Sequence, residues 1–366
     1  MKFECDRLKL TEAVLNVQRA VSVKSTTPAL EGILVKAAGR VITLYGYDLD
    51  ICINTSLEAD IKEDGEAVIP AKLFSEILRR MPENKILIDV NEKNIVYLKS
   101  GNADYKIIGM PASDYPELPL IKNSDTIQID GETLSSMIRQ TIYAVSDKDT
   151  KPAHKGSLFE IKDKTIRIVS VDGYRLALRT EKIDYDGEKE FIVPGKSLLE
   201  VSKLINENTN IVEMIASDRH IIFKIENYSV ITRLIEAEFM NYRASIPKVC
   251  TTEIRINTDS IIKTVERMSL LLTDKMKSPI RCYIDNDTIR TSCETPLGKA
   301  TDQINAKIQG EPVEIGFNNN FLLDAFRHTE SDEVMLKMTG ALNPMTITPT
   351  EGDSFLFLLL PMRLSR

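Results

Sequence analysis

The stretch Ile69-Pro-Ala-Lys-Leu-Phe-Ser-Glu-Ile-Leu-Arg-Arg-Met81 decides the fold, because the chain contains its pattern three times. Its apolar residues recur at helical spacing and share one face: Leu73, Phe74, Ile77, Leu78 and Met81. The pattern returns as Val193-Pro-Gly-Lys-Ser-Leu-Leu-Glu-Val-Ser-Lys-Leu-Ile205 and, less closely, as Gly316-Phe-Asn-Asn-Asn-Phe-Leu-Leu-Asp-Ala-Phe-Arg327. Alignment of Lys72, Lys196 and Asn319 separates the copies by 124 and 123 residues, about a third of the chain. A repeat of this length predicts three copies of one domain rather than a solenoid of short units.

Length and composition indicate a soluble protein of several domains. A chain of 366 residues is too long for one compact core and suits three domains of about 120 residues each. The composition, 43% hydrophobic and 28% charged, is ordinary for a globular protein. No apolar run reaches the roughly 18 residues of a membrane helix, and the first residues have no signal-peptide core. We therefore expect a cytoplasmic protein without membrane contact.

The residues that usually carry catalysis or bind metals form no recognisable motif. The five cysteines are scattered, which predicts reduced thiols rather than disulfides or a zinc site. The three histidines lie in separate segments, and no phosphate-binding glycine loop is present in the sequence. Asp172-Gly173 could suggest acid–base chemistry, but a turn between strands with glycine at positive φ is the better interpretation. The sequence therefore predicts no catalytic residue, no metal site and no cofactor.

Charge is distributed unevenly between the expected helices and the rest of the chain. The expected helices are 8–21, 70–81, 131–146, 195–206, 257–272 and 318–328, and they contain 11 Lys and Arg against 7 Asp and Glu. Because the net charge of the chain is −7, the remainder carries −11. The helices are mildly basic and everything else is acidic, a contrast that chance could also produce.

Each third of the chain follows the same order of helix, strands, helix and strands. Corresponding strand–turn–strand segments occur at 42–53, 166–178 and 289–300, with Asp48, Asp172 and Glu294 expected at the bends. Further strand pairs are expected after the second helix of each third. This order predicts an α+β protein in which each domain has two halves, each a helix backed by antiparallel strands. The predicted domains are 1–122, 127–248 and 250–366.

Short motifs along the whole chain carry a family resemblance. They are Met1-Lys-Phe3, Thr27-Pro28, Asp114-Tyr-Pro-Glu-Leu118, Gly156-Ser-Leu-Phe-Glu160, Val171-Asp-Gly-Tyr-Arg-Leu176, Glu314-Ile-Gly-Phe-Asn318 and Leu360-Pro-Met-Arg-Leu364. In this order and spacing, they make the chain similar to the β subunit of bacterial DNA polymerase III, the sliding clamp. The resemblance implies a DNA-clamp fold and a ring-shaped head-to-tail homodimer with helices lining the hole. Twelve helices packed side by side would leave a hole of roughly 25 Å, wide enough for duplex DNA.

The resemblance also implies what such a ring does. It would encircle double-stranded DNA without reading its sequence, and it would tether the polymerase for processive synthesis without catalysing a reaction. By similarity, Lys24 and Lys148 lie in loops that reach toward the phosphates. The helices of the repeated pattern offer further DNA-facing candidates, namely Lys72, Arg79, Arg80, Lys196 and Lys203, for each of which a solvated side chain without a partner remains the alternative. The dimer contact is expected between Tyr105 and Ile107 of the first domain and Leu270 and Leu271 of the third. Packing within one domain remains an alternative for these four residues.

A peptide pocket is the second function that the resemblance implies. It would bind short segments of the polymerase III catalytic subunit, the clamp loader and other proteins that carry a clamp-binding motif. The implied pocket residues are His154, Val171, Gly173, Tyr174, Arg175, Leu176, Met240, Ser245, Asn318, Phe321, Leu342, Pro344, Leu358, Leu360, Pro361, Met362 and Arg363. His154, Met240 and Ser245 depart from the family, which usually has an aliphatic residue, a proline and a larger aliphatic residue at these positions.

Two other functions remain open at this point. The chain could be a scaffold of the same fold that binds proteins but does not close on DNA. It could also be an enzyme, for example a hydrolase that uses Asp172 and Tyr174. Ring closure separates the first alternative from a clamp, and turnover that depends on Asp172 would indicate the second.

Overall fold

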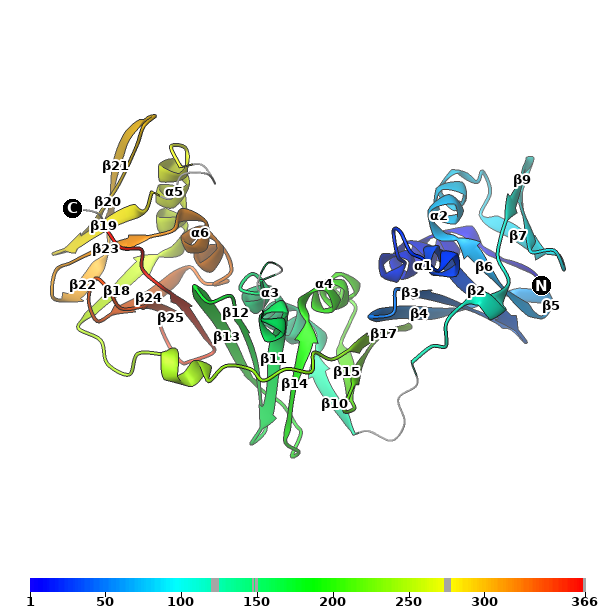
Figure 1. The fold of residues 1–366 in the computed structure, drawn as a ribbon, viewed down its shortest axis with the longest axis horizontal. Coiled ribbons are helices and arrows are strands. Elements are labelled where there is room, and N and C mark those ends of the chain that lie inside the picture. Colours follow the sequence, from blue (N-terminus) through cyan, green and yellow to red (C-terminus); the bar gives the residue numbers. More distant parts are fainter. Residues whose placement is uncertain (120–124, 147, 149–150, 273–277, 365–366) are drawn as a thin grey trace. The chain divides into compact units, whose positions relative to one another are not determined.

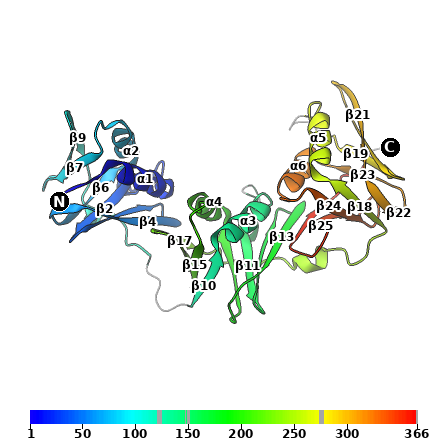
Figure 2. The same cartoon turned by 180° about the vertical axis from the view of Figure 1, so that it is seen from behind.

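The structure is a computed structural model that describes residues 1–119, 125–146, 148, 151–272 and 278–364. The chain separates into two compact units. Figures 1 and 2 label its helices and strands from opposite sides. Unit 1 contains Met1–Glu132 and Leu199–Leu234, and unit 2 contains Thr133–Leu198 and Ile235–Arg366. The middle third of the sequence is therefore divided between the two units.

The α-helices of the described chain lie where the repeats predict them. They are α1 (Arg7–Val17), α2 (Ala71–Arg80), α3 (Gly131–Ile142), α4 (Gly195–Leu204), α5 (Thr258–Ser269) and α6 (Asn319–Arg327). Side-chain caps fix several starts, since Asp6 accepts a hydrogen bond from the backbone N of Lys9 at 2.8 Å. The expected face of α2 is wrong at Leu73, which is exposed, while Ser75, which was not predicted for that face, is buried. The buried stripe follows Ala71, Phe74 and Leu78, which leaves Leu73 pointing outward.

Unit 1 contains two antiparallel sheets. The five-stranded sheet has the order β5-β1-β7-β8-β9, with β1 (Lys2–Asp6), β5 (Asp60–Glu63), β7 (Lys85–Val90), β8 (Ile95–Ser100) and β9 (Ala103–Ile108). The eight-stranded sheet has the order β10-β15-β16-β17-β4-β3-β2-β6, with β2 (Gly32–Ala38), β3 (Val41–Tyr47), β4 (Ile51–Glu58), β6 (Gly65–Pro70), β10 (Thr126–Asp130), β15 (Ile211–Ala216), β16 (His220–Ile225) and β17 (Tyr228–Arg233). The eight-stranded sheet joins the first third of the chain to part of the second through the β4–β17 pair.

Unit 2 repeats this plan. Its nine-stranded sheet has the order β14-β11-β12-β13-β26-β25-β24-β18-β22, with β11 (Gly156–Lys162), β12 (Thr165–Val171), β13 (Arg175–Lys182), β14 (Lys189–Pro194), β18 (Thr252–Asn257), β22 (Lys307–Gly310), β24 (Glu333–Met338), β25 (Met345–Pro349) and β26 (Phe355–Leu359). Its four-stranded sheet has the order β21-β20-β19-β23, with β19 (Ile280–Asp285), β20 (Thr288–Thr295), β21 (Gly298–Asn305) and β23 (Val313–Phe317). The third bend is a correction to the prediction, because Glu294 lies inside β20 and not in a turn.

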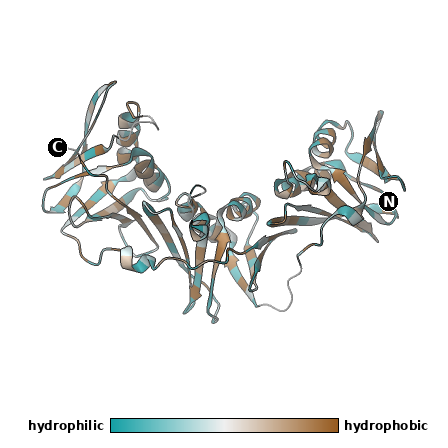
Figure 3. Ribbon diagram, viewed as in Figure 1, coloured by the Kyte–Doolittle hydropathy of each residue, from teal (hydrophilic) through white to brown (hydrophobic). Residues whose placement is uncertain are grey.

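Alternation along the strands explains how the helices and sheets form a core. In β15 and β24 every second residue is buried, and Figure 3 shows brown and teal segments alternating along many strands. In unit 2 the buried side chains of α5 and α6 join those of both sheets in one cluster, which includes Val265, Phe326, Ile315 and Phe357. The helices therefore cover one face of the sheets, as expected for this α+β order.

Candidate functional site

The turn between β12 and β13 is held by the side chain of its first residue, Asp172. Gly173 has φ +87°, as the sequence predicts for a strand-connecting turn. One carboxylate oxygen of Asp172, Oδ1, accepts hydrogen bonds from the backbone N of Tyr174 at 3.0 Å and of Arg175 at 3.1 Å. The turn leaves the Tyr174 ring exposed, and the Tyr174 carbonyl accepts a hydrogen bond from the N of Leu360 at 2.9 Å. Asp172 is thus occupied in holding the turn.

Arg175 links this turn to α6. Its Nε donates to Asp172 Oδ2 at 2.8 Å, and its Nη1 forms an ion pair with Asp324 of α6. The guanidinium lies over two rings, with its carbon 5.3 Å from the centroid of Tyr143 and 4.6 Å from that of Phe321. The side chain is only 11% exposed. Two carboxylates and two rings therefore hold the Arg175 side chain in place, so its charge is not free to bind another anion.

A separate apolar cluster uses the alternate residues of β13 and β26, so it lies on the opposite face of the sheet from the Arg175 side chain. It contains Ala153, Val171, Leu176, Tyr242 and Leu358, and Leu176 pairs directly with Leu358 across β13 and β26. The ring of Tyr174 stacks on Phe321, with 6.0 Å between the centroids. Burial and the nearby Glu160 carboxylate raise the pKa of Tyr242, whose hydroxyl hydrogen-bonds to that carboxylate, so the phenol stays protonated. An apolar surface beside a firmly held turn suits a hydrophobic peptide side chain.

All the predicted pocket residues lie in unit 2, but they differ in what they do there. Asn318 caps α6, since its side chain accepts hydrogen bonds from the backbone N of Asn320 and Phe321. His154 is buried within a short 3₁₀ turn, Pro152–Lys155. Exposed predicted residues include Met240, Leu342 and Leu360. The remaining predicted members are Ser245 at the end of a 3₁₀ turn, Pro344 before β25, and Pro361, Met362 and Arg363 after β26.

Sequence reasoning did not single out Asp324 and Tyr143, which hold Arg175 in this arrangement. Burial raises the pKa of Tyr143 well above its ordinary value, so the ring stays neutral beneath the guanidinium. His328 stacks on the other side of the network, 4.7 Å from Tyr143 between ring centroids. These residues are far apart in sequence, and only the acidic residue within an amphipathic helix could have pointed to Asp324.

The basic residues predicted to face DNA are all exposed. Lys24, Lys72, Arg79, Arg80 and Lys203 belong to unit 1, and Lys148 and Lys196 belong to unit 2. Lys72, Arg79 and Arg80 share α2, where Arg80 also donates to the carbonyl of Glu76 at 3.1 Å. Lys203 forms an ion pair with Glu200 at 2.7 Å, which weakens its attraction for another anion. Among the residues that the structure describes, the other six cations have no ion pair that they would have to give up to meet a phosphate.

The residues predicted for the dimer contact differ in exposure. Tyr105 on β9 is 42% exposed, whereas Ile107 is buried against its own sheet. Leu270, which directly follows α5, is 82% exposed, and Leu271 packs partly on the core of unit 2. Tyr105 and Leu270 therefore have the apolar surface to give to a partner, while Ile107 has little.

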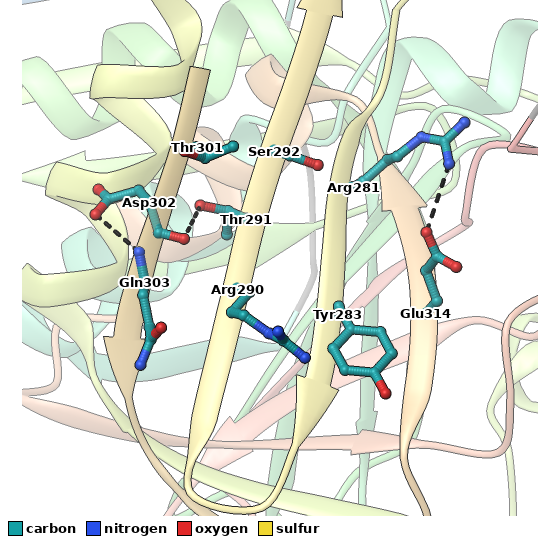
Figure 4. Close-up of a pocket in the computed structure, with 9 residues that line it drawn as sticks. All are labelled: Arg281, Tyr283, Arg290, Thr291, Ser292, Thr301, Asp302, Gln303 and Glu314. Carbon is teal, nitrogen blue, oxygen red and sulfur yellow. Dashed lines mark hydrogen bonds and ion pairs between the residues drawn. The ribbon is translucent and has the colours of Figure 1, made fainter. Parts of the chain in front are cut away.

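A hollow that the sequence did not predict lies on the outer face of the four-stranded sheet in unit 2. The hollow has a volume of about 590 Å³. Figure 4 shows the side chains from β19, β20, β21 and β23 that line it. The guanidinium of Arg290 lies 4.6 Å from the centroid of Tyr283, and Arg281 is 3.5 Å from Glu314. None of the predicted site residues lines it. The polar residue at every second position of β19 and β20 is the signal that could have indicated an exposed face.

The described residues contain no group of three or more His, Cys, Asp or Glu able to hold a metal ion. The same part of the chain contains no helix both long and apolar enough to cross a membrane.

Comparisons with known proteins agree along the whole chain. Models of the DNA polymerase III beta subunit match in succession, with the N-terminal domain at residues 1–119, the central domain at 128–241 and the C-terminal domain at 243–363. The chain belongs to the DNA polymerase III beta subunit family. The beta sliding clamp of Bacillus subtilis is 31% identical over 376 residues, which cover 99% of this chain and 100% of that protein. That of Halalkalibacterium halodurans is 31% identical over 378 residues, with 99% and 100% covered.

The solved structures give the same result for the fold. The crystal structure of the sliding clamp from Bacillus subtilis matches with a TM-score of 0.97 at 31% identity, and the match covers 100% of both chains. The predicted three-domain clamp fold is thus confirmed. This family member has the function of a sliding clamp in DNA replication and is not an enzyme. The scaffold and hydrolase alternatives are not favoured.

Proposed function

We propose that two copies of this chain form a head-to-tail ring that encircles duplex DNA and tethers the replicative polymerase. Three clamp domains from each copy, at 1–122, 127–248 and 250–366, would make a ring of six. The relatives named beta sliding clamps support this proposal. We also infer a cytoplasmic location, where the replicating chromosome of a bacterium lies.

The main support for the ring comes from the way in which successive repeats join inside one chain. β17, the last strand of the second repeat, pairs antiparallel with β4 of the first. β26, the last strand of the third repeat, pairs in the same way with β13 of the second. The equivalent strands that remain are β9 of the first repeat and β21 of the third, and each ends its sheet (Figure 1). Pairing β9 of one copy with β21 of the next would close the ring and cover both edges.

The internal junctions also predict the register of this closure. When the strand–turn–strand hairpins of the three repeats are aligned with one another, three residues occupy the same position of the second strand: Cys52, Leu176 and Lys299. When the last hairpins of the three repeats are aligned in the same way, three residues occupy the same position of the final strand: Lys106, Ile231 and Leu358. Because Ile231 pairs with Cys52 and Leu358 with Leu176, Lys106 would pair with Lys299. The full register would be Ala103 with Asp302, Asp104 with Thr301, Tyr105 with Ala300, Lys106 with Lys299, and Ile107 with Gly298.

This register suits the residues around the seam, by which we mean the proposed β9–β21 pairing. Tyr105 would lie opposite Ala300, which packs partly on the core of unit 2. The equivalent pairs inside the chain are Val230 with Ile53 and Phe357 with Ala177, and all four of these residues are buried. The exposed part of Tyr105 would thus be covered by a surface like those at the internal junctions.

DNA would be held by enclosure and not by tight contacts. The exposed cations that we assign to the DNA-facing surface are Lys24, Lys148, Lys72, Arg79, Arg80, Lys196 and Lys203. Such side chains attract phosphates weakly, without reading sequence, and the attraction falls as salt rises. A closed ring with weak contacts can move along the duplex while it remains attached.

The polymerase, the clamp loader and other partners would bind at the apolar cluster that contains Val171, Leu176 and Leu358. The support is this cluster together with the turn between β12 and β13, which Arg175 anchors through Asp172. A short peptide segment with apolar anchors suits this surface. Met240, Leu360 and the other predicted pocket residues would border it.

A cysteine cross-link tests both the ring and its register. In a Cys250→Ser background, which removes an exposed thiol, Asp104→Cys would be combined with Thr301→Cys. Opposed residues of antiparallel strands have Cα atoms about 4.5–5.5 Å apart, within the range of a disulfide. Mild oxidation is expected to give a covalent dimer on a non-reducing gel.

The control combines Asp104→Cys with Gln303→Cys, which lies on the same face but two residues away. It should cross-link poorly. Equal yields from the two pairs would contradict the register. A wild-type chain that stays monomeric by analytical ultracentrifugation at micromolar concentration would contradict the ring itself.

A further inference from the structure

The proposed β9–β21 seam is equivalent to the two junctions inside the chain, β17–β4 and β26–β13. One pair of opposed residues differs in polarity among these three junctions. At the first internal junction Ile231 pairs with Cys52, and at the second Leu358 pairs with Leu176. All four side chains are at most 9% exposed. Apolar pairs of this kind stabilise both internal junctions, which never have to open.

The same position of the proposed seam holds two lysines. Lys106 is exposed on the outer face of its sheet, where it pairs with Tyr97 of β8, itself 36% exposed. Lys299 is exposed on the outer face of the four-stranded sheet, opposite Glu294 of β20. Residues directly opposed in antiparallel strands have Cβ atoms about 4.5–5.5 Å apart, so the two like charges would destabilise the pairing.

Neighbouring charges offset this repulsion only in part. Glu294 reaches Lys299 at 3.9 Å, with the two side chains 78% and 64% exposed, so water screens that pair. Asp104 would lie diagonal to Lys299, about 7–8 Å away, which the long lysine side chain can reach but which is farther than the directly opposed Lys106. Lys99 of β8, opposite Asp104, adds a further positive charge to the same face. Within the part of one chain that the structure describes, Lys106 itself has no ion-pair partner.

We propose that Lys106 and Lys299 repel each other across the seam and make it the weakest of the three equivalent junctions. The ring would then open there, between copies, when DNA has to enter. This inference rests on the proposed ring and its register. Each ring has two seams, so any change at one lysine acts twice on dimer stability.

Charge reversal at Lys106 tests the inference. Lys106→Glu would replace the repulsion by an attraction at both seams, and we expect roughly a tenfold lower dimer Kd at low salt. Lys106→Met, which only removes the charge, should give a smaller decrease. The dissociation constant would be measured by analytical ultracentrifugation with fluorescence detection at several salt concentrations.

The salt dependence of the dimer Kd shows independently whether the charges at the seam repel or attract each other. Added salt screens exposed charges, so it should tighten the wild-type dimer and loosen the Lys106→Glu dimer. The matched control is Lys99→Glu, on the same face of the same sheet but one strand farther from the seam. It should change Kd less than Lys106→Glu does.

The outcomes separate this inference from the ring on which it rests. A wild-type chain that never dimerises would refute the ring. A wild-type dimer whose Kd is unchanged or raised by Lys106→Glu would refute only the repulsion between the two lysines. Equal tightening by Lys99→Glu would also refute it, because the effect would then come from net charge and not from opposed residues.

Discussion

The turns after β3 and after β12 have the same backbone but different side chains. Asp48 Oδ1 accepts hydrogen bonds from the N of Asp50 at 3.0 Å and of Ile51 at 2.8 Å, as Asp172 does one repeat later. Leu49 has φ +80°, close to the +87° of Gly173. The apolar clusters beside the turns also correspond, with Ala29, Leu34, Tyr45, Tyr47 and Val68 equivalent to Ala153, Leu158, Val169, Val171 and Ile192. The first two repeats therefore share the same turn, including its individual hydrogen bonds.

The difference lies in the residue that follows each turn. At the second turn Arg175 reaches two carboxylates and two rings, whereas at the first turn Ile51 is simply buried. Tyr174, exposed at the second turn, corresponds to Asp50 at the first. A few side chains on a shared scaffold thus distinguish the proposed pocket from a structural turn.

The largest effect is expected when the Arg175 network is broken. Arg175→Met would leave the largely buried Asp172 carboxylate and the partly exposed Asp324 without their cation, at a cost of about 3 kcal/mol in the free energy of unfolding. The turn that precedes Leu176 would lose this anchor, so a fluorescent peptide copying the clamp-binding segment of the polymerase should bind at least tenfold more weakly.

Denaturant unfolding and fluorescence anisotropy would measure these two changes. Ile51→Val is the matched control at the equivalent position of the first repeat, and it should cost only about 1 kcal/mol and leave peptide binding unchanged. Peptide binding that survives Arg175→Met would remove the network from the account of the pocket.

The second effect compares the two aspartates. Asp48→Ala removes a carboxylate that accepts two backbone hydrogen bonds, and it should cost about 2 kcal/mol in unfolding free energy. Asp172→Ala removes the same bonds and also one partner of Arg175, so the cost should be larger by about 1 kcal/mol or more. Equal costs in urea titrations would mean that the Arg175 contact adds nothing to the turn.

The smallest effect concerns backbone strain. A leucine in the left-handed region is strained by about 1–2 kcal/mol, and glycine relieves this at some entropic cost, so Leu49→Gly should stabilise the protein by about 0.5–1 kcal/mol. Gly173→Ala should destabilise it by a similar amount, because the added Cβ would meet nothing within 4 Å and only the conformation would be strained. Thermal unfolding would measure the stability change of each variant. A loss of stability in Leu49→Gly would mean that the Leu49 side chain contributes packing.

The sequence predicted the local elements well because their signals are local. The repeated helix pattern, Asp48 and Asp172 at the bends and Gly173 at positive φ all follow from spacing and turn chemistry. Leu73 and Glu294 were misplaced, because one residue of helical phase or a shorter turn changes which side chain points outward. The network of Arg175, Tyr143 and Asp324 depends on contacts between distant segments, which no local pattern encodes.

The central claim is that the β9–β21 seam closes a ring that retains DNA by enclosure. The most direct test loads the Asp104→Cys, Thr301→Cys variant on a nicked circular plasmid, oxidises it, and passes it through a sizing column in high salt. The account predicts that the cross-linked protein elutes with the circular plasmid and leaves it once a restriction enzyme linearises the DNA. Release from the intact circle, or retention on the linear DNA, would contradict it.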